Sequence, residues 1–202
     1  DLLRLGARDG KFRVLRRDEP FNWSSLNNAG VAETDADLLV FANDDIEMLS
    51  LGWDDRVRRA LAEPNIGVVG VRLLYPDRTI QHAGIVLGFG PAGAEHEGRG
   101  CSESDDGPGG RFRRRRTVSA VTGAFLACRR ADFEAAGGFD GETLPVHFND
   151  VDLCLRLAGR GLRTIYEPAI EALHYESKTM RSEFREAYSY ALAMRDRGED
   201  CR

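Results

Sequence analysis

The sequence predicts a layered α/β fold with a mixed, mostly parallel sheet flanked by helices. Two observations lead to this prediction. Strand-like and helix-like segments alternate along the chain, and short turn signals separate them. In open sheets of this kind, ligands bind beyond the carboxyl ends of the strands. We therefore expect the functional residues at that edge of the sheet.

Apolar or alternating runs of residues predict the strands. The clearest is the β-branched run IGVVGVRLL at residues 66–74, which is typical of a central strand. The other predicted strands cover residues 11–16, 38–42, 79–87 in short pieces, 118–128 with a break at Gly123, 162–166 and 169–174.

Apolar residues at helical spacing predict the helices. In one of them Trp53, Val57, Ala60 and Leu61 share a face. The predicted helices cover residues 23–33, 53–63, 130–136, 149–159 and 182–195. Residues 88–111 differ from these segments, because 10 of the 24 are Gly or Pro, and they predict a long mobile loop.

Length and composition are typical of one soluble globular domain. The 202 residues are 42% apolar and 30% charged, and no apolar run approaches the roughly 20 residues that cross a bilayer. The net charge of −5 argues against a general nucleic-acid binder. The four cysteines form no C-x-x-C pair, which argues against a zinc knuckle or redox motif and favours the reducing cytoplasm.

Two acidic groups stand out. Residues 43–45, Asn-Asp-Asp, directly follow the predicted strand 38–42. Asn and Asp favour turns, so an exposed turn is one interpretation, and a cation that neutralises the two carboxylates is the other. Residues 149–152 read Asn-Asp-Val-Asp at a predicted helix start, where acids stabilise the helix dipole. Asp152 also stands four residues before Arg156, at ion-pair spacing.

Six segments, in order, resemble the family-2 inverting glycosyltransferases with the GT-A fold, and most closely the bacterial rhamnosyltransferase-like members that build surface polysaccharides. They are FNWSSLNNAG (21–30), LLVFANDDIEM (38–48), VGVRLLYPDRTIQHAGIVLG (69–88), VTGAFLACRRADFEAAGGFD (121–140), FNDVDLCLRL (148–157) and ALHYES (172–177). The resemblance runs from about residue 11 to about residue 178, and its specificity lies in the order of the segments rather than in any one of them.

The resemblance implies a role for each matching position. Asp45, the last acid of the D-x-D motif, would bind a divalent cation, Mn²⁺ or Mg²⁺, together with His174. Asn43 and Asp44 would lie on the donor side, with Asn43 replacing the usual first Asp. Asp150 would be the general base. The acceptor side would include Thr122, Gly123, His147, Asn149 and Asp152, with Asn149 replacing the usual Glu.

The implied activity is transfer of a sugar from a nucleotide-diphosphate sugar to a hydroxyl of a glycan or lipid-linked acceptor, with inversion. A degenerate, non-catalytic module that binds glycan or a partner is the alternative, and the replacements Asn43 and Asn149 favour it. A nucleotidyltransferase is a third option, but the sequence shows no Gly-rich, basic phosphate loop near its start.

The family's first strands, with the nucleobase and ribose site, have no counterpart in the sequence. We therefore expect residues 1–202 to be the later part of one catalytic domain, cytoplasmic or at the inner face of the membrane. Peripheral membrane association and a homo-oligomer covering a bare sheet edge are left open. Residues 113–116, four arginines, are interpreted as a solvated charged segment, with contact to phosphate as the alternative. Residues 81–84 also match the subgroup. One interpretation of this stretch is that His82 faces the acceptor.

Overall fold

A computed structural model describes residues 13–88 and 93–175. Seven strands form its central sheet, in the order β1-β8-β3-β9-β2, with β4 paired to β3 and β7 paired to β9. They are β1 (Leu38–Ala42), β2 (Ile46–Met48), β3 (Ile66–Leu74), β4 (Ile80–His82), β7 (Arg116–Val118), β8 (Phe125–Arg129) and β9 (Arg163–His174). A separate two-stranded sheet pairs β5 (Ile85–Leu87) with β6 (Ala94–His96).

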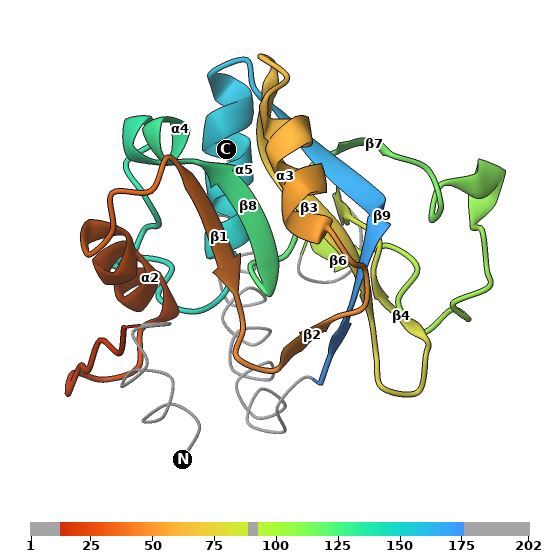
Figure 1. Ribbon diagram of the computed structural model, residues 1–202, viewed down its shortest axis with the longest axis horizontal. Helices are drawn as coiled ribbons and strands as arrows, with labels where there is room; N and C mark the ends of the chain where they lie inside the picture. Colours follow the sequence, from red (N-terminus) through yellow and green to blue (C-terminus); the bar gives the residue numbers. More distant parts are fainter. Residues whose placement is uncertain (1–12, 89–92, 176–202) are drawn as a thin grey trace, which may run out of the picture.

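Helices cover both faces of the central sheet (Figure 1). They are α2 (Trp23–Ala32), α3 (Trp53–Leu61), α4 (Arg130–Ala135) and α5 (Asn149–Gly159), with a short 3-10 helix, η1 (Pro108–Gly110). The apolar face of α3 packs in one core cluster with β3 and β8. Helix α5 packs in a second cluster with residues of β1, α4 and α2. The predicted α/β fold, a sheet between helices, is confirmed.

The direction of the strands corrects one part of the prediction. Among the described strands of the central sheet only β3 and β9 pair in parallel, and the other pairs are antiparallel. The sheet is therefore mixed but not mostly parallel. The physical reason is the connections: β3 returns to β4 through a tight turn at residues 75–79, and β8 runs between β1 and β3 against both.

The pairing brings three carboxyl ends to one edge. Strands β1 and β3 both run opposite to β8, and β9 runs parallel to β3. The ends of β1, at Ala42, and of β9, at His174, therefore lie on the same side of the sheet. All nine residues of β3 are buried, which makes β3 the fixed centre of this arrangement.

Several predicted elements differ from the structure. Residues 13–16 form no strand, and their exposed side chains offer no face to bury. The two strands expected over 162–174 form the single strand β9, whose register against β3 shifts between Val71 and Arg72 and so accommodates Pro168. The sequence did not predict β2 or β6. The helix expected at 182–195 lies outside the described residues.

The Gly- and Pro-rich stretch 88–111 contains β6 and η1 and is joined to the sheet. Arg72, which is 1% exposed, donates to the carbonyl oxygen of Glu103 at 2.5 Å and pairs with Glu171 at 2.5 Å. Arg113 donates to the same Glu103 oxygen at 2.5 Å. Mobility of this stretch stays a prediction. In the described part of the chain, no helix is long and apolar enough to cross a membrane.

Candidate functional site

The turn between β1 and β2 contains the first acidic group. Asp44 is exposed, whereas Asn43 and Asp45 are partly buried. The backbone N–H of Asn43 donates to the carbonyl oxygen of Ala124 at 3.1 Å, which extends the β1–β8 pairing into the turn. Residues 44 and 45 therefore form the turn that the sequence indicated, but only Asp44 is exposed in it. Whether the turn also binds a cation depends on what its side chains contact.

His174, at the end of β9, lies against this turn. Its backbone pairs with Ile46 of β2, and the next N–H, of Tyr175, donates to the carbonyl oxygen of Asp45 at 3.1 Å. The imidazole Nε2 lies 3.1 Å from Asp45 Oδ1 and 3.1 Å from Asn43 Nδ2. The structure thus brings together the two residues that the sequence proposed as metal ligands.

Asp45 and His174 are a suitable ligand pair for a divalent cation shared with a phosphate. A carboxylate oxygen and an imidazole nitrogen both suit Mn²⁺, and the oxygen suits Mg²⁺. Within the described ranges, no group of three or more His, Cys, Asp or Glu side chains is gathered for a metal. A cation bound by this pair would need further ligands, and substrate phosphate oxygens are its usual complement.

Asp150, in the first turn of α5, is held by two backbone N–H groups. Its Oδ2 accepts a hydrogen bond from Gly123 at 2.7 Å, and its Oδ1 accepts one from Val151 at 2.8 Å. Burial raises the pKa of this carboxyl, whereas the two N–H groups and His147 act in the opposite direction. Each oxygen keeps acceptor capacity for a further donor, as a base that receives a proton requires.

The backbone around Asp150 is tightly constrained. Phe148, directly before α5, has a φ of 61°, a left-handed conformation that is uncommon for a bulky residue. The ring of Trp23 packs over Gly123 so closely that a Cβ there would lie 2.9 Å from it. Gly123 is therefore required for close packing, and its N–H stays available to Asp150.

Residues 122–124 join the two acidic groups. Gly123 donates to Asp150, and the neighbouring Ala124 accepts from Asn43. The hydroxyl of Thr122 accepts from the N–H of Ala124 at 3.3 Å, which stabilises this short turn. The start of β8 therefore lies between the end of β1 and the start of α5.

Two of the predicted acceptor-side residues make contacts within the fold. Asn149 is 3% exposed, and its amide donates to Ser24 Oγ and to the carbonyl oxygen of Val146, each at 3.0 Å. These bonds attach the start of α5 to α2. His147 is partly buried and close enough to Asp150 to affect its pKa. Contact of either residue with an acceptor stays a prediction.

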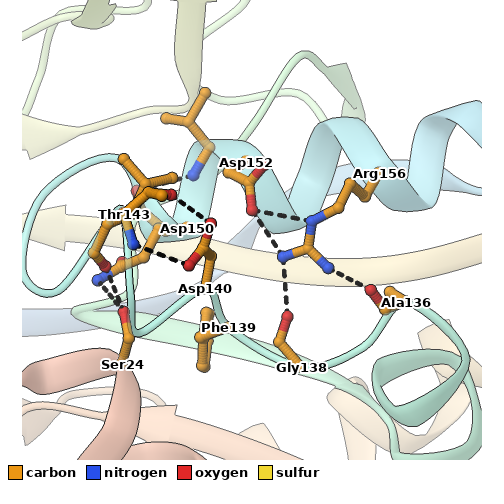
Figure 2. Close-up of polar contacts among 12 residues, drawn as sticks. Ser24, Ala136, Gly138, Phe139, Asp140, Thr143, Asp150, Asp152 and Arg156 are labelled. Atoms are coloured by element: carbon orange, nitrogen blue, oxygen red, sulfur yellow. Dashed lines mark hydrogen bonds and ion pairs between the residues drawn. The ribbon is translucent and has the colours of Figure 1, made fainter.

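Asp152 forms the ion pair that its spacing predicted. Its Oδ2 lies 2.6 Å from Arg156 Nη2 and 2.8 Å from Nε (Figure 2). Arg156 also donates to the carbonyl oxygens of Ala136 and Gly138, the latter at 2.8 Å. Asp152 thus orients an arginine that holds the turn after α4, which explains this acid without a substrate.

Gln81 is the residue that the sequence did not assign. It is 3% exposed on β4, and its Oε1 lies 2.7 Å from His174 Nδ1. The neighbouring His82 is fully buried beside His96, with 3.3 Å between their Nδ1 atoms. His82 is therefore a core residue and not one that faces an acceptor. The resemblance over residues 81–84 was the sequence signal for this region.

Three of the four arginines at residues 113–116 form ion pairs or hydrogen bonds with other residues of the chain. Arg115 pairs with Glu63 at 2.6 Å and with Glu167 at 3.2 Å. Arg116 pairs with Glu97 and lies 5.4 Å over the ring of Tyr166. Together with the bond from Arg113 to Glu103, these contacts favour the interpretation as a charged surface segment over a phosphate site.

No protein-family model matches the chain. Seven curated proteins are similar to it, among them three from different bacteria. An uncharacterised protein of Sinorhizobium fredii, y4gI, is 38% identical over 84% of this chain and 18% of its own length. The O-antigen biosynthesis protein RfbC of Myxococcus xanthus is 34% identical over 87% of this chain and 14% of its own. The Escherichia coli rhamnosyltransferase WbbL is 40% identical over 37% of this chain and 28% of its own. The chain thus spans less than a fifth of the first two relatives.

Two solved structures share the fold. GalNAc-T7, in complex with UDP, GalNAc and Mn²⁺, has a TM-score of 0.65 at 10% identity, covering 86% of this chain and 34% of its own. The mannosyltransferase PcManGT of Pyrobaculum calidifontis, in complex with GDP-Man and Mn²⁺, has a TM-score of 0.62 at 14% identity. The match covers 100% of this chain and 51% of PcManGT. The chain has the GT-A fold of these two enzymes, and its sequence is similar to proteins named for rhamnosyl transfer and O-antigen biosynthesis. The resemblance stated from the sequence is therefore confirmed in the fold and in the sequence similarity.

Proposed function

We propose that this GT-A chain forms the metal and acceptor side of an inverting sugar transferase. The donor would be a nucleotide-diphosphate sugar, and the acceptor a hydroxyl of a glycan or lipid-linked saccharide. The observation that supports this most strongly is the turn at residues 122–124, which hydrogen-bonds to Asn43 on one side and to Asp150 on the other. A cation-binding pair and a candidate base thus lie at one edge of the sheet.

Asp45 and His174 would hold Mn²⁺ or Mg²⁺, which supplies positive charge to offset the leaving diphosphate. The 3.1 Å between Asp45 Oδ1 and His174 Nε2 supports this assignment, because two electron-pair donors face each other there. Asp44 is exposed beside the pair, in a place suited to the donor's ribose or sugar hydroxyls. Asn43 contributes hydrogen bonds but no charge.

Asp150 would act as the general base. The acceptor oxygen attacks the anomeric carbon as the bond from that carbon to the diphosphate oxygen breaks, and Asp150 takes the hydroxyl proton. A single displacement inverts the anomeric configuration. The raised pKa supports the role, because a base becomes a better proton acceptor as its pKa approaches the working pH. The N–H bonds from Gly123 and Val151 fix its direction.

The wider setting belongs to the same proposal. Relatives named for rhamnosyl transfer and O-antigen biosynthesis support a surface-polysaccharide acceptor. We place the chain in the cytoplasm at the inner face of the membrane, as the later part of a single catalytic domain. Association with a membrane and with a second copy are included as proposals.

A non-catalytic module is the second candidate, and two residues favour it. Asn43 and Asn149 stand where the family has acids, and the Asn149 amide is bound within the fold. Such a module would keep glycan binding but lose transfer.

Transfer assays on the intact protein separate the two candidates. A panel of UDP-, GDP- and dTDP-sugars is offered with lipid-diphosphate-linked saccharide acceptors, with and without chelator. We expect a product of inverted anomeric configuration, lost in chelator and in Asp150→Asn. A retained configuration, or undiminished transfer in chelator, contradicts the proposed mechanism. Glycan binding without transfer from any donor favours the module.

A further inference from the structure

Gln81 lies at an irregularity of the sheet. Strand β4 pairs with the end of β3, where Leu73 is opposite His82 and Leu74 is opposite Ile80, so Gln81 is the extra residue of a β-bulge. Bulges redirect a side chain that regular pairing would point elsewhere. On its other side, Leu74 pairs with Leu173 of β9. Gln81 thus reaches past the end of β3 to the residue after Leu173.

That residue is His174, and the contact has a defined polarity. Gln81 Oε1 can only accept a hydrogen bond, and it lies 2.7 Å from His174 Nδ1. The proton of a neutral His174 ring must therefore be on Nδ1. Its Nε2 then has a lone pair, which can accept from Asn43 Nδ2 at 3.1 Å. The same lone pair faces Asp45 Oδ1, also at 3.1 Å, and a cation between the two atoms would offset the repulsion between their electron pairs.

We propose that Gln81 is a positioning residue, which fixes the Nδ1–H tautomer of His174 and turns the Nε2 lone pair toward Asp45. The pair is then pre-arranged for a cation before any cation binds. A hydrogen bond to the second ring nitrogen orients a metal-binding histidine and raises its basicity. The effect on cation binding rests on the proposed function, whereas the tautomer can be measured without any metal.

Burial strengthens the effect of this hydrogen bond. Gln81 is 3% exposed and His174 is 8% exposed, so little water competes for Nδ1. Gln81 is also the single glutamine of the chain, in the stretch TIQHAG. An apolar residue at this position would remove the Oε1 acceptor that lies 2.7 Å from Nδ1 of this nearly buried ring.

The test is the tautomer of His174 in the 202-residue chain, read from long-range ¹H–¹⁵N correlation spectra of the histidine rings. The chain has four histidines, and His174→Ala identifies the signals of this ring. At a pH where the ring is neutral, we expect a protonated Nδ1 and an unprotonated Nε2 in the wild type. Gln81→Met, of similar volume but without an acceptor, should lose that pattern, and Gln81→Glu should retain the proton on Nδ1. Thr79→Val, on the same hairpin, is the matched control and should leave the spectrum unchanged.

Mn²⁺ binding to the same variants is measured by electron paramagnetic resonance. We expect Gln81→Met to weaken binding roughly 10- to 100-fold and Gln81→Glu to restore it. If Gln81→Met does not fold, Gln81→Asn withdraws the acceptor by one methylene and should show the same loss.

The outcomes separate this inference from the proposed function. A wild-type ring protonated on Nε2 alone, or a tautomer that does not change in Gln81→Met and Gln81→Asn, overturns the role of Gln81 whatever the metal does. A tautomer that changes as expected supports that role even where no variant binds Mn²⁺, and in that case the metal part of the proposed function fails.

Discussion

The two acidic groups at this edge of the sheet are held in different ways. Asp45 meets His174 through side chains that come from the β1–β2 turn, β4 and β9. Asp150 is held by backbone N–H groups, one of them from its own helix turn. The first arrangement depends on side chains from segments distant in the sequence, whereas the second depends on two backbone N–H groups, one local and one from the distant Gly123. We therefore expect substitutions around Asp45 to act through side-chain geometry, and those at Asp150 to act on the chemistry directly.

The largest effect is expected from Asp150→Asn. Loss of a general base lowers the rate by about 10²–10⁴-fold, while the neighbouring N–H groups still find one acceptor oxygen. Sugar transfer by the intact protein and circular dichroism measure the two properties. Asp140→Asn is the control, because Asp140 is an acid of the same region whose carboxylate accepts from the backbone N–H of Thr143 (Figure 2) and from that of Glu142. Equal loss in both variants would contradict the assignment.

The pH dependence of sugar transfer also tests Asp150 as the general base. A base works only when deprotonated, and burial places the pKa of Asp150 above its ordinary 3.8. We expect kcat/KM to fall about tenfold per pH unit on the acid side, starting at a higher pH than an exposed Asp would give. An acid limb at or below the ordinary value would contradict the burial argument.

The free energy of unfolding should also fall in mild acid, because of the two buried histidines His82 and His96. Burial and neighbouring positive charges lower the pKa of His96 from 6.5 to about 4 and that of His82 well below 6.5, with Arg99 and Arg116 facing His82. The folded state disfavours their protonated forms, so their contribution is complete above pH 6.5 and is lost as pH falls toward 4. We expect urea unfolding to show a loss of about 1–3 kcal/mol over this window.

His96→Gln should reduce that loss. Asp77 and Asp140 do not contribute to the loss of stability between pH 6.5 and 4. Local hydrogen bonds lower their pKa values from 3.8, so their own contribution to stability is lost only at lower pH. An unchanged slope in His96→Gln would show that the histidine pair is not the source.

The smallest effect is expected from Asn43→Asp, which restores the first acid of the motif. One more carboxylate beside Asp45 should strengthen Mn²⁺ binding about tenfold, or ~1.4 kcal/mol. Electron paramagnetic resonance titration measures it. Equal or weaker binding would show that the Asn43–His174 hydrogen bond matters more than the added charge.

Much of this architecture is predictable, because local patterns determine it. Strands β1 and β3 and helix α5 have the predicted bounds, since dense apolar runs and a polar helix start define them. The direction of β8 was not predictable in this way, because it depends on how the connections cross the sheet. The same holds for Gln81: its role depends on a bulge between β3 and β4 and on a strand far along the chain. Asp45 and His174 were paired through the family resemblance and not through any local pattern.

Mn²⁺ binding to this chain, with and without UDP or dTDP and beside Asp45→Ala, tests the central claim most directly. Electron paramagnetic resonance detects loss of the free-ion signal. The account predicts binding that the nucleotide strengthens and that Asp45→Ala removes, since Asp45 and His174 supply only part of the coordination. Binding that is equal in the wild type and in Asp45→Ala, or absent from both with either nucleotide, would contradict a cation site at the β1–β2 turn.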